Sequence, residues 1–189
     1  MTYLIMTSER SDAYEMTIDE LPAAVEALQI AFDEGEAIRA SVPVIDVAYS
    51  READERKTDN IVGPPQMGLI VNTRVRAVFD SLEIRNIQYF PVRLVESAGE
   101  VDDSYSIANV VGCFDVIDRD ASSLNLRADG SIRFIDSLSL RLEPGREYGH
   151  IFRLAGFPSL MAVSKDLDAA LAAHEITGLQ RYTPEAFSL

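Results

Sequence analysis

Hydrophobic positions recur with the same spacing in two stretches of the chain, Leu69–Pro91 and Leu160–Tyr182. Each stretch begins with a short apolar run typical of a buried strand, followed by a residue suited to cap a helix, Asn72 or Ser164. Apolar residues then recur at the i, i+3, i+4 spacing of an amphipathic helix, and a second apolar run follows. The pattern therefore predicts two strand–helix–strand units.

The two units align without a gap at an offset of 92 residues. Identities are few, but the caps and the apolar positions coincide. The aligned pairs are Val71 with Val163, Asn72 with Ser164, Val75 with Leu167, Phe79 with Leu171, Ile84 with Ile176, and Gln88 with Gln180. Internal duplication and chance convergence of two similar units both remain open.

The first part of the chain predicts a strand, a helix and a second strand. Tyr3–Met6 reads as a short strand, and Thr17–Glu20 has the spacing of a capping box. Apolar residues at helical spacing then predict a helix to about Glu34, ended by Gly35. Val42–Tyr49 reads as the second strand.

A charged run and a break follow. Ser50–Asn60 mixes both signs of charge and predicts a mobile loop or a short solvated helix. Gly63-Pro64-Pro65 is the clearest breaker in the chain. We therefore expect a boundary between an N-terminal part, residues 1–62, and residues 63–189, as one compact domain or as two lobes sharing a core.

Strand patterns dominate between the two units. Ile87–Val95 is a strong strand in which Pro91 predicts an edge or a bulge, and a polar turn follows at Glu96–Asp103. Further strands are predicted at residues 105–111 and 114–117. Residues 124–142 alternate around Asp129-Gly130, a hairpin signal. Mostly antiparallel strands with about three helices predict an α+β fold.

Composition places the chain among folded proteins. Hydrophobic residues make up 47% and charged residues 25%. The single cysteine permits no internal disulfide, which fits a reducing compartment. The N-terminus lacks the basic start of a signal peptide, and no apolar run reaches the roughly 20 residues that span a bilayer. We therefore expect a cytoplasmic protein.

Charge changes the picture most. The formal net charge is −14 at pH 7, and residues 1–38 hold nine acids against Arg10 alone, a balance of −8. Nucleic acid and anionic membranes are poor partners for such a chain. Two readings remain: a solvated face that maintains solubility, or a docking surface for a basic partner. If the acidic segment is a docking surface, we expect the contacts on the predicted helix and at its ends, at Glu20, Glu26, Asp33 and Glu34.

No residue pattern indicates catalysis, a metal or a cofactor. Cys113 lies in an apolar strand context that predicts a buried side chain, His174 is expected to pack against the core at a helix end, and His150 has no clear role. The EF-hand glycine and distal glutamate are missing around Asp115, Asp118 and Asp120, so this run predicts a polar turn. The same three aspartates are the second candidate contact surface.

Several motifs occur in a fixed order from about Pro64 to Tyr182. Ile151-Phe-Arg-Leu-Ala-Gly156 precedes the Ser164-capped helix and a Thr-Gly-Leu ending, while Tyr89–Leu94 and Asn109–Asp118 lie upstream. Together they resemble a bacterial immunity-protein family of polymorphic toxin systems, the eleventh numbered immunity class, typified by a myxobacterial protein. Residues 1–60 match no part of that pattern.

The resemblance implies a non-enzymatic antidote that binds and neutralises a co-encoded toxin, and it supplies no catalytic residues. With the acidic surface, the partner is expected to be a basic toxin, for example a nuclease, and a homodimer is left open. The alternative is a small-molecule enzyme or ligand-binding domain with a pocket between the two units, using Cys113 or His150.

Overall fold

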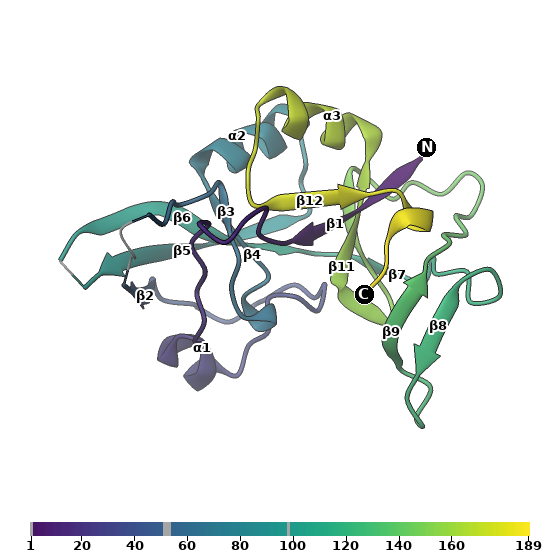
Figure 1. Ribbon diagram of the computed structural model, residues 1–189, viewed down its shortest axis with the longest axis horizontal. Coiled ribbons are helices and arrows are strands. Elements are labelled where there is room, and N and C mark those ends of the chain that lie inside the picture. Colours follow the sequence, from purple (N-terminus) through teal and green to yellow (C-terminus); the bar gives the residue numbers. More distant parts are fainter. Residues whose placement is uncertain (1, 51–53, 98) are drawn as a thin grey trace.

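The computed structural model describes residues 2–50, 54–97 and 99–189. Over these residues the chain is α+β, with three α-helices and twelve strands (Figure 1). The helices are α1 (Ala23–Leu28), α2 (Thr73–Ser81) and α3 (Lys165–Ala173), and two 3₁₀ turns are η1 (Pro65–Met67) and η2 (Pro184–Ala186). The strands are β1 (Tyr3–Ser8), β2 (Ile45–Tyr49), β3 (Asn60–Ile61), β4 (Leu69–Asn72), β5 (Ile87–Glu96), β6 (Val101–Val110), β7 (Cys113–Phe114), β8 (Ser123–Leu126), β9 (Ile132–Ser137), β10 (Ile151–Leu154), β11 (Phe157–Ser164) and β12 (Leu179–Tyr182).

Two five-stranded sheets carry the fold. The first has the strand order β12-β1-β11-β10-β7 and the second β2-β5-β6-β4-β3, while β8 and β9 form a separate hairpin. Pairing is antiparallel except between β10 and β7 and between β2 and β5. The N-terminal strand β1 lies between β11 and β12, so the start of the chain is a central part of the first sheet.

The two strand–helix–strand units are confirmed and have matching topology. In the first, β4 and β5 flank β6; in the second, β11 and β12 flank β1, and each intervening strand is antiparallel to both neighbours. Asn72 and Ser164 cap the helices with their side chains. Glu83 and Glu175 follow the helices in the left-handed region, with φ of 52° and 51°. The 92-residue offset therefore holds in backbone conformation as well as in apolar pattern.

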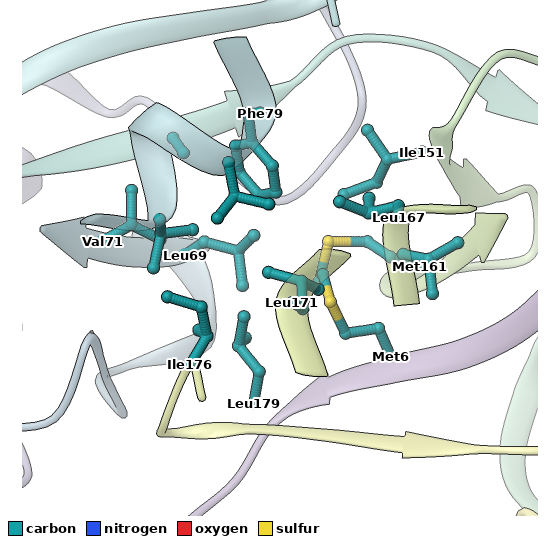
Figure 2. Close-up of a cluster of buried hydrophobic side chains, with 14 of the residues drawn as sticks. Met6, Leu69, Val71, Phe79, Ile151, Met161, Leu167, Leu171, Ile176 and Leu179 are labelled. Atoms are coloured by element: carbon teal, nitrogen blue, oxygen red, sulfur yellow. The ribbon is translucent and has the colours of Figure 1, made fainter. Parts of the chain in front are cut away.

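A shared hydrophobic cluster lies between the helices and one face of both sheets. Phe79 from α2 and Leu171 from α3 point into it, and both are fully buried (Figure 2). Every second residue of β4 and of the second half of β11 contributes to it. Side chains alternate between the two faces of a strand, so the residues in between face the other side of the sheet. Its buried members are Met6, Leu69, Val71, Val75, Val78, Phe79, Ala108, Val110, Ile151, Met161, Val163, Leu167, Leu171, Ile176 and Leu179.

The opposite faces of the sheets are covered by two further clusters. Under the first sheet, the β8–β9 hairpin and the C-terminal segment supply Ile132, Ile135 and Phe187. Under the second sheet, the N-terminal segment supplies Val25 and Phe32. The hairpin predicted at Asp129-Gly130 is confirmed, and its core-facing residues join it to the first sheet.

The predicted N-terminal helix is wrong in its length and its cap. Only six residues, Ala23–Leu28, are helical, and no side chain caps them. Thr17 donates its hydroxyl hydrogen bond to Asp19, while the Ile18 amide donates to the Val62 carbonyl at 2.8 Å. Because this backbone pairs with a distant segment, the capping box cannot form. Gly35 has a φ of 80° but ends no helix.

The charged run also differs from its prediction. Residues 51–53 lie outside the described residues, but Thr58, Asp59 and Asn60 are buried rather than solvated. The predicted turn at residues 96–103 is shorter, because β5 reaches Glu96 and β6 starts at Val101. Pro91 lies next to a register shift between Val92 and Leu94, as a bulge requires. No helix in the described part of the chain is long and apolar enough to cross a membrane.

Candidate partner-binding surface

Three glutamates of the acidic N-terminal segment face solvent. Glu26 lies on α1, with Glu20 before it and Glu34 after it, and all three side chains are exposed. The segment is held by Val25 and Phe32, which are buried in the cluster under the second sheet. Because the apolar side is buried in that core, these carboxylates lie on the solvent side of the segment.

Asp33 is different from its neighbours. Its side chain is half-buried rather than placed on a polar helix face. Burial raises the pKa of the Asp33 carboxyl, and the positive charge of Arg153 only partly offsets this effect. Within the described residues, Asp33 makes no ion pair. Among these residues it is therefore a desolvated carboxylate without a direct cationic partner.

Arg153 on β10 is a fully buried cation that sequence reasoning missed. Its guanidinium donates to three backbone carbonyls: Nε to Val110 at 3.3 Å, Nη1 to Pro158 at 2.7 Å, and Nη2 to Phe32 at 3.0 Å. Burial lowers its pKa to about 10, countered first by the charge of Asp33. An arginine within the apolar run of residues 151–155 was the available signal, because a charge in a buried strand needs compensation.

A cavity of about 270 Å³ opens beside this pair, where the two sheets meet. We call it the junction cavity. It is formed by the end of β1, the η1 region, the start of β11 and the C-terminal segment, with Arg153 in its wall. Its other lining residues include Thr7, Glu9, Asp33, Leu69, Phe157 and Leu160.

A buried polar network joins the two units, and sequence reasoning missed it too. The Asp59 carboxylate accepts hydrogen bonds from Asn72 Nδ2 at 2.8 Å, from Arg74 Nη1 at 2.8 Å, and from the Thr177 amide and hydroxyl at 3.0 Å. Its pKa is lowered, since these bonds outweigh the opposing effect of desolvation. Asp59 is thus a structural residue within the charged run.

The second candidate contact surface comprises Asp115, Asp118 and Asp120, and only two of these aspartates are exposed. Asp115 and Asp120 are exposed. The Asp118 carboxylate accepts from the backbone amides of Asp120 and Ala121 at 3.2 and 3.3 Å, and lies 3.9 Å from Arg141 Nη1. Asp118 therefore stabilises its own turn. In the ranges 2–50, 54–97 and 99–189, no group of three histidine, cysteine or acidic residues is placed to hold a metal ion.

Cys113, His174 and His150 each lie in a different structural setting. Cys113 is exposed, so its predicted burial is wrong, because it lies on the two-residue edge strand β7. Partial desolvation raises the pKa of its thiol. His174 is the C-cap of α3 and is exposed, so its predicted packing against the core is also wrong. His150 Nδ1 lies 2.8 Å from the hydroxyl of the buried cap Ser164.

Hydrophobic side chains fill the space between α2 and α3. Figure 2 shows Phe79, Leu171 and Ile176 converging there, and each is buried in the shared cluster. The alternative enzyme or ligand-binding function required a pocket at this place. Hydrophobic packing occupies the space between the helices, and the cavity that residues of both units line, the junction cavity, opens at the sheet junction instead.

Comparison with protein families gives one match. The model of an immunity protein family, Imm11, matches residues 41–184, which is well over half of the chain. The motif resemblance begins at about Pro64, but the family match begins earlier, at residue 41. It therefore also includes β2 and the charged run. A comparison with curated proteins gives no match. The chain therefore belongs to the Imm11 immunity protein family, whose members serve in immunity to toxins.

Proposed function

We propose that this chain is a cytoplasmic antidote that binds a cognate basic toxin directly and blocks it without performing chemistry. Membership of an immunity family carries the proposal. No cofactor or metal enters it. Nucleic acid and anionic membrane are not among the proposed partners, because a net charge of −14 repels both.

The acidic N-terminal segment is the proposed first contact. Glu20, Glu26 and Glu34 are exposed on a segment whose residues 1–38 carry a balance of −8. Such a field speeds the encounter with a positively charged partner and disfavours partners of the wrong sign. Asp115 and Asp120 remain a secondary candidate contact.

The test is an association measurement with an inactivated variant of the toxin encoded beside this gene. Glu20, Glu26 and Glu34 are replaced together by lysine, and stopped-flow association is measured at two salt concentrations. The on-rate should fall by about tenfold or more at low salt, and the deficit should shrink at high salt as ions screen the field.

The matched control replaces three exposed acids elsewhere, Asp136, Glu147 and Glu185, by lysine. It changes the net charge by the same amount, so it separates a local contact from a general loss of negative charge. An equal on-rate for the two triple variants would refute the acidic face as the contact. Absence of any complex with the unaltered chain would refute direct toxin binding.

A further inference from the structure

The junction cavity combines features that suit one particular occupant. Glu9 and Asp33 supply negative charge, while Leu69, Phe157 and Leu160 supply apolar wall. At about 270 Å³, the cavity lies below the range usual for drug-sized ligands. Its volume suits a single side chain better than a whole small molecule.

We propose that the junction cavity receives one arginine or lysine side chain of the toxin, whose charged end lies between Asp33 and Glu9. This inference rests on the proposed function and adds an anchoring site to it. Long basic side chains bury an apolar stem and keep a charged head, which matches a cavity with apolar walls and two carboxylates. Arginines seated in pockets are common centres of binding energy at interfaces.

The charges around the cavity favour a cation in spite of Arg153. The guanidinium of Arg153 is fully buried and donates hydrogen bonds to three backbone carbonyls. Asp33 is therefore left without an ion pair among the described residues, and burial penalises its charged form. Glu9 accepts one hydrogen bond, from the Tyr182 hydroxyl at 2.8 Å, and keeps acceptor capacity. A second cation would compensate both carboxylates.

A buried hydroxyl at the same cavity independently indicates room for a polar partner. Thr7 lines the cavity and is only 7% exposed, yet its Oγ1 has no hydrogen-bond partner in the part of the chain that the structure describes. Buried polar groups are rarely left unpaired in native proteins. An ammonium or guanidinium N–H could donate to the Thr7 hydroxyl oxygen, which can accept as well as donate.

A small probe tests the cavity without the toxin. The full chain labelled with ¹⁵N is titrated with n-butylguanidinium, which reproduces an arginine side chain, and with n-butylurea, its neutral counterpart. Butylguanidinium should cause saturating shifts at amides around the cavity, such as those of Ser8, Gly68 and Met161, and butylurea should not. Equal shifts with the two probes, or no localised shifts, would overturn the proposal.

The variant Asp33→Asn should weaken butylguanidinium binding by about tenfold or more, because the cation loses its desolvated partner. Since burial disfavours the ionised Asp33, a neutral isostere should fold. Glu147→Gln removes an exposed charge outside the cavity and should bind the probe as the unaltered chain does. Equal affinity of the two variants would overturn the role of Asp33, and the comparison of probes on the unaltered chain stands even if Asp33→Asn misfolds.

Toxin binding then separates the two proposals. If the unaltered chain binds the inactivated toxin and Asp33→Asn binds it as tightly as Glu147→Gln, the anchoring site is refuted while the proposed function holds. If the unaltered chain binds butylguanidinium but not the toxin, the proposed function fails and the cavity retains its affinity for cations.

Discussion

Asp59 and Thr177 lie 118 positions apart, and both the amide and the hydroxyl of Thr177 donate hydrogen bonds to Asp59 Oδ2 at 3.0 Å. Asn72 Nδ2 donates to Oδ1 of the same carboxylate, and Arg74 Nη1 donates to both of its oxygens. A single buried acid therefore connects the charged run, the start of α2 and the segment that leads into β12. This connection fixes the two units relative to each other.

Replacing Asp59 by asparagine should lower the free energy of unfolding by about 2–4 kcal/mol, because an amide cannot accept all of these hydrogen bonds and leaves buried donors unpaired. Urea unfolding at pH 7 measures the change. Asp103→Asn, at an exposed position, is the control and should change stability by less than about 0.5 kcal/mol. A similar midpoint for the two variants would show that the network contributes little.

The pH dependence of stability should follow the same residue. The folded-state pKa of Asp59 is lowered, so its contribution is complete above the unfolded pKa of about 3.9 and is lost as the pH falls through the folded value. The stability difference between the unaltered chain and Asp59→Asn should therefore shrink below about pH 4. A difference that stays constant from pH 7 to pH 3 would contradict this assignment.

Phe79→Ala and Leu171→Ala should each cost about 2–5 kcal/mol, since both residues are fully buried in the cluster between the helices. Thermal or urea unfolding measures the loss, with Lys165→Ala, at an exposed position on α3, as the control. An unchanged midpoint for either large-to-small variant would mean that the two positions are not equivalent anchors.

Gly178→Ala should be more destabilising than Gly145→Ala. The two glycines have nearly equal φ values, 79° and 80°, so the strain of a left-handed alanine, about 1–2 kcal/mol, is common to both. A Cβ at position 178 would also overlap the carbonyl oxygen of Asn60, whereas nothing lies within 4 Å at position 145. Comparable unfolding free energies for the two variants would disprove the close backbone approach between β3 and the start of β12.

Cys113→Ala should leave both folding and toxin protection unchanged, because the thiol is exposed and its pKa is raised rather than lowered. A raised pKa also predicts slow alkylation by iodoacetamide at pH 7, compared with free cysteine. Loss of protection by a normally folded Cys113→Ala protein would instead support an enzymatic function that uses Cys113.

Local patterns were sufficient for the two strand–helix–strand units. Asn72 and Ser164 cap their helices as predicted, and the helix bounds keep the 92-residue offset. Capping and apolar periodicity act over a few residues, so they can be read directly from the sequence. The same reasoning failed at Thr17–Glu20, where pairing of Ile18 with Val62 uses the backbone in another way.

The amino-acid sequence by itself determined the fold class, the two strand–helix–strand units and the strong negative charge of the N-terminal segment. The tertiary structure alone decided that Asp59 and Arg153 are buried, that Asp33 lies beside Arg153, and that the helices α2 and α3 share one packed cluster. The reason is physical. The partners of Asp59 and Arg153 come from segments distant in the chain, and no local spacing encodes which of them will meet.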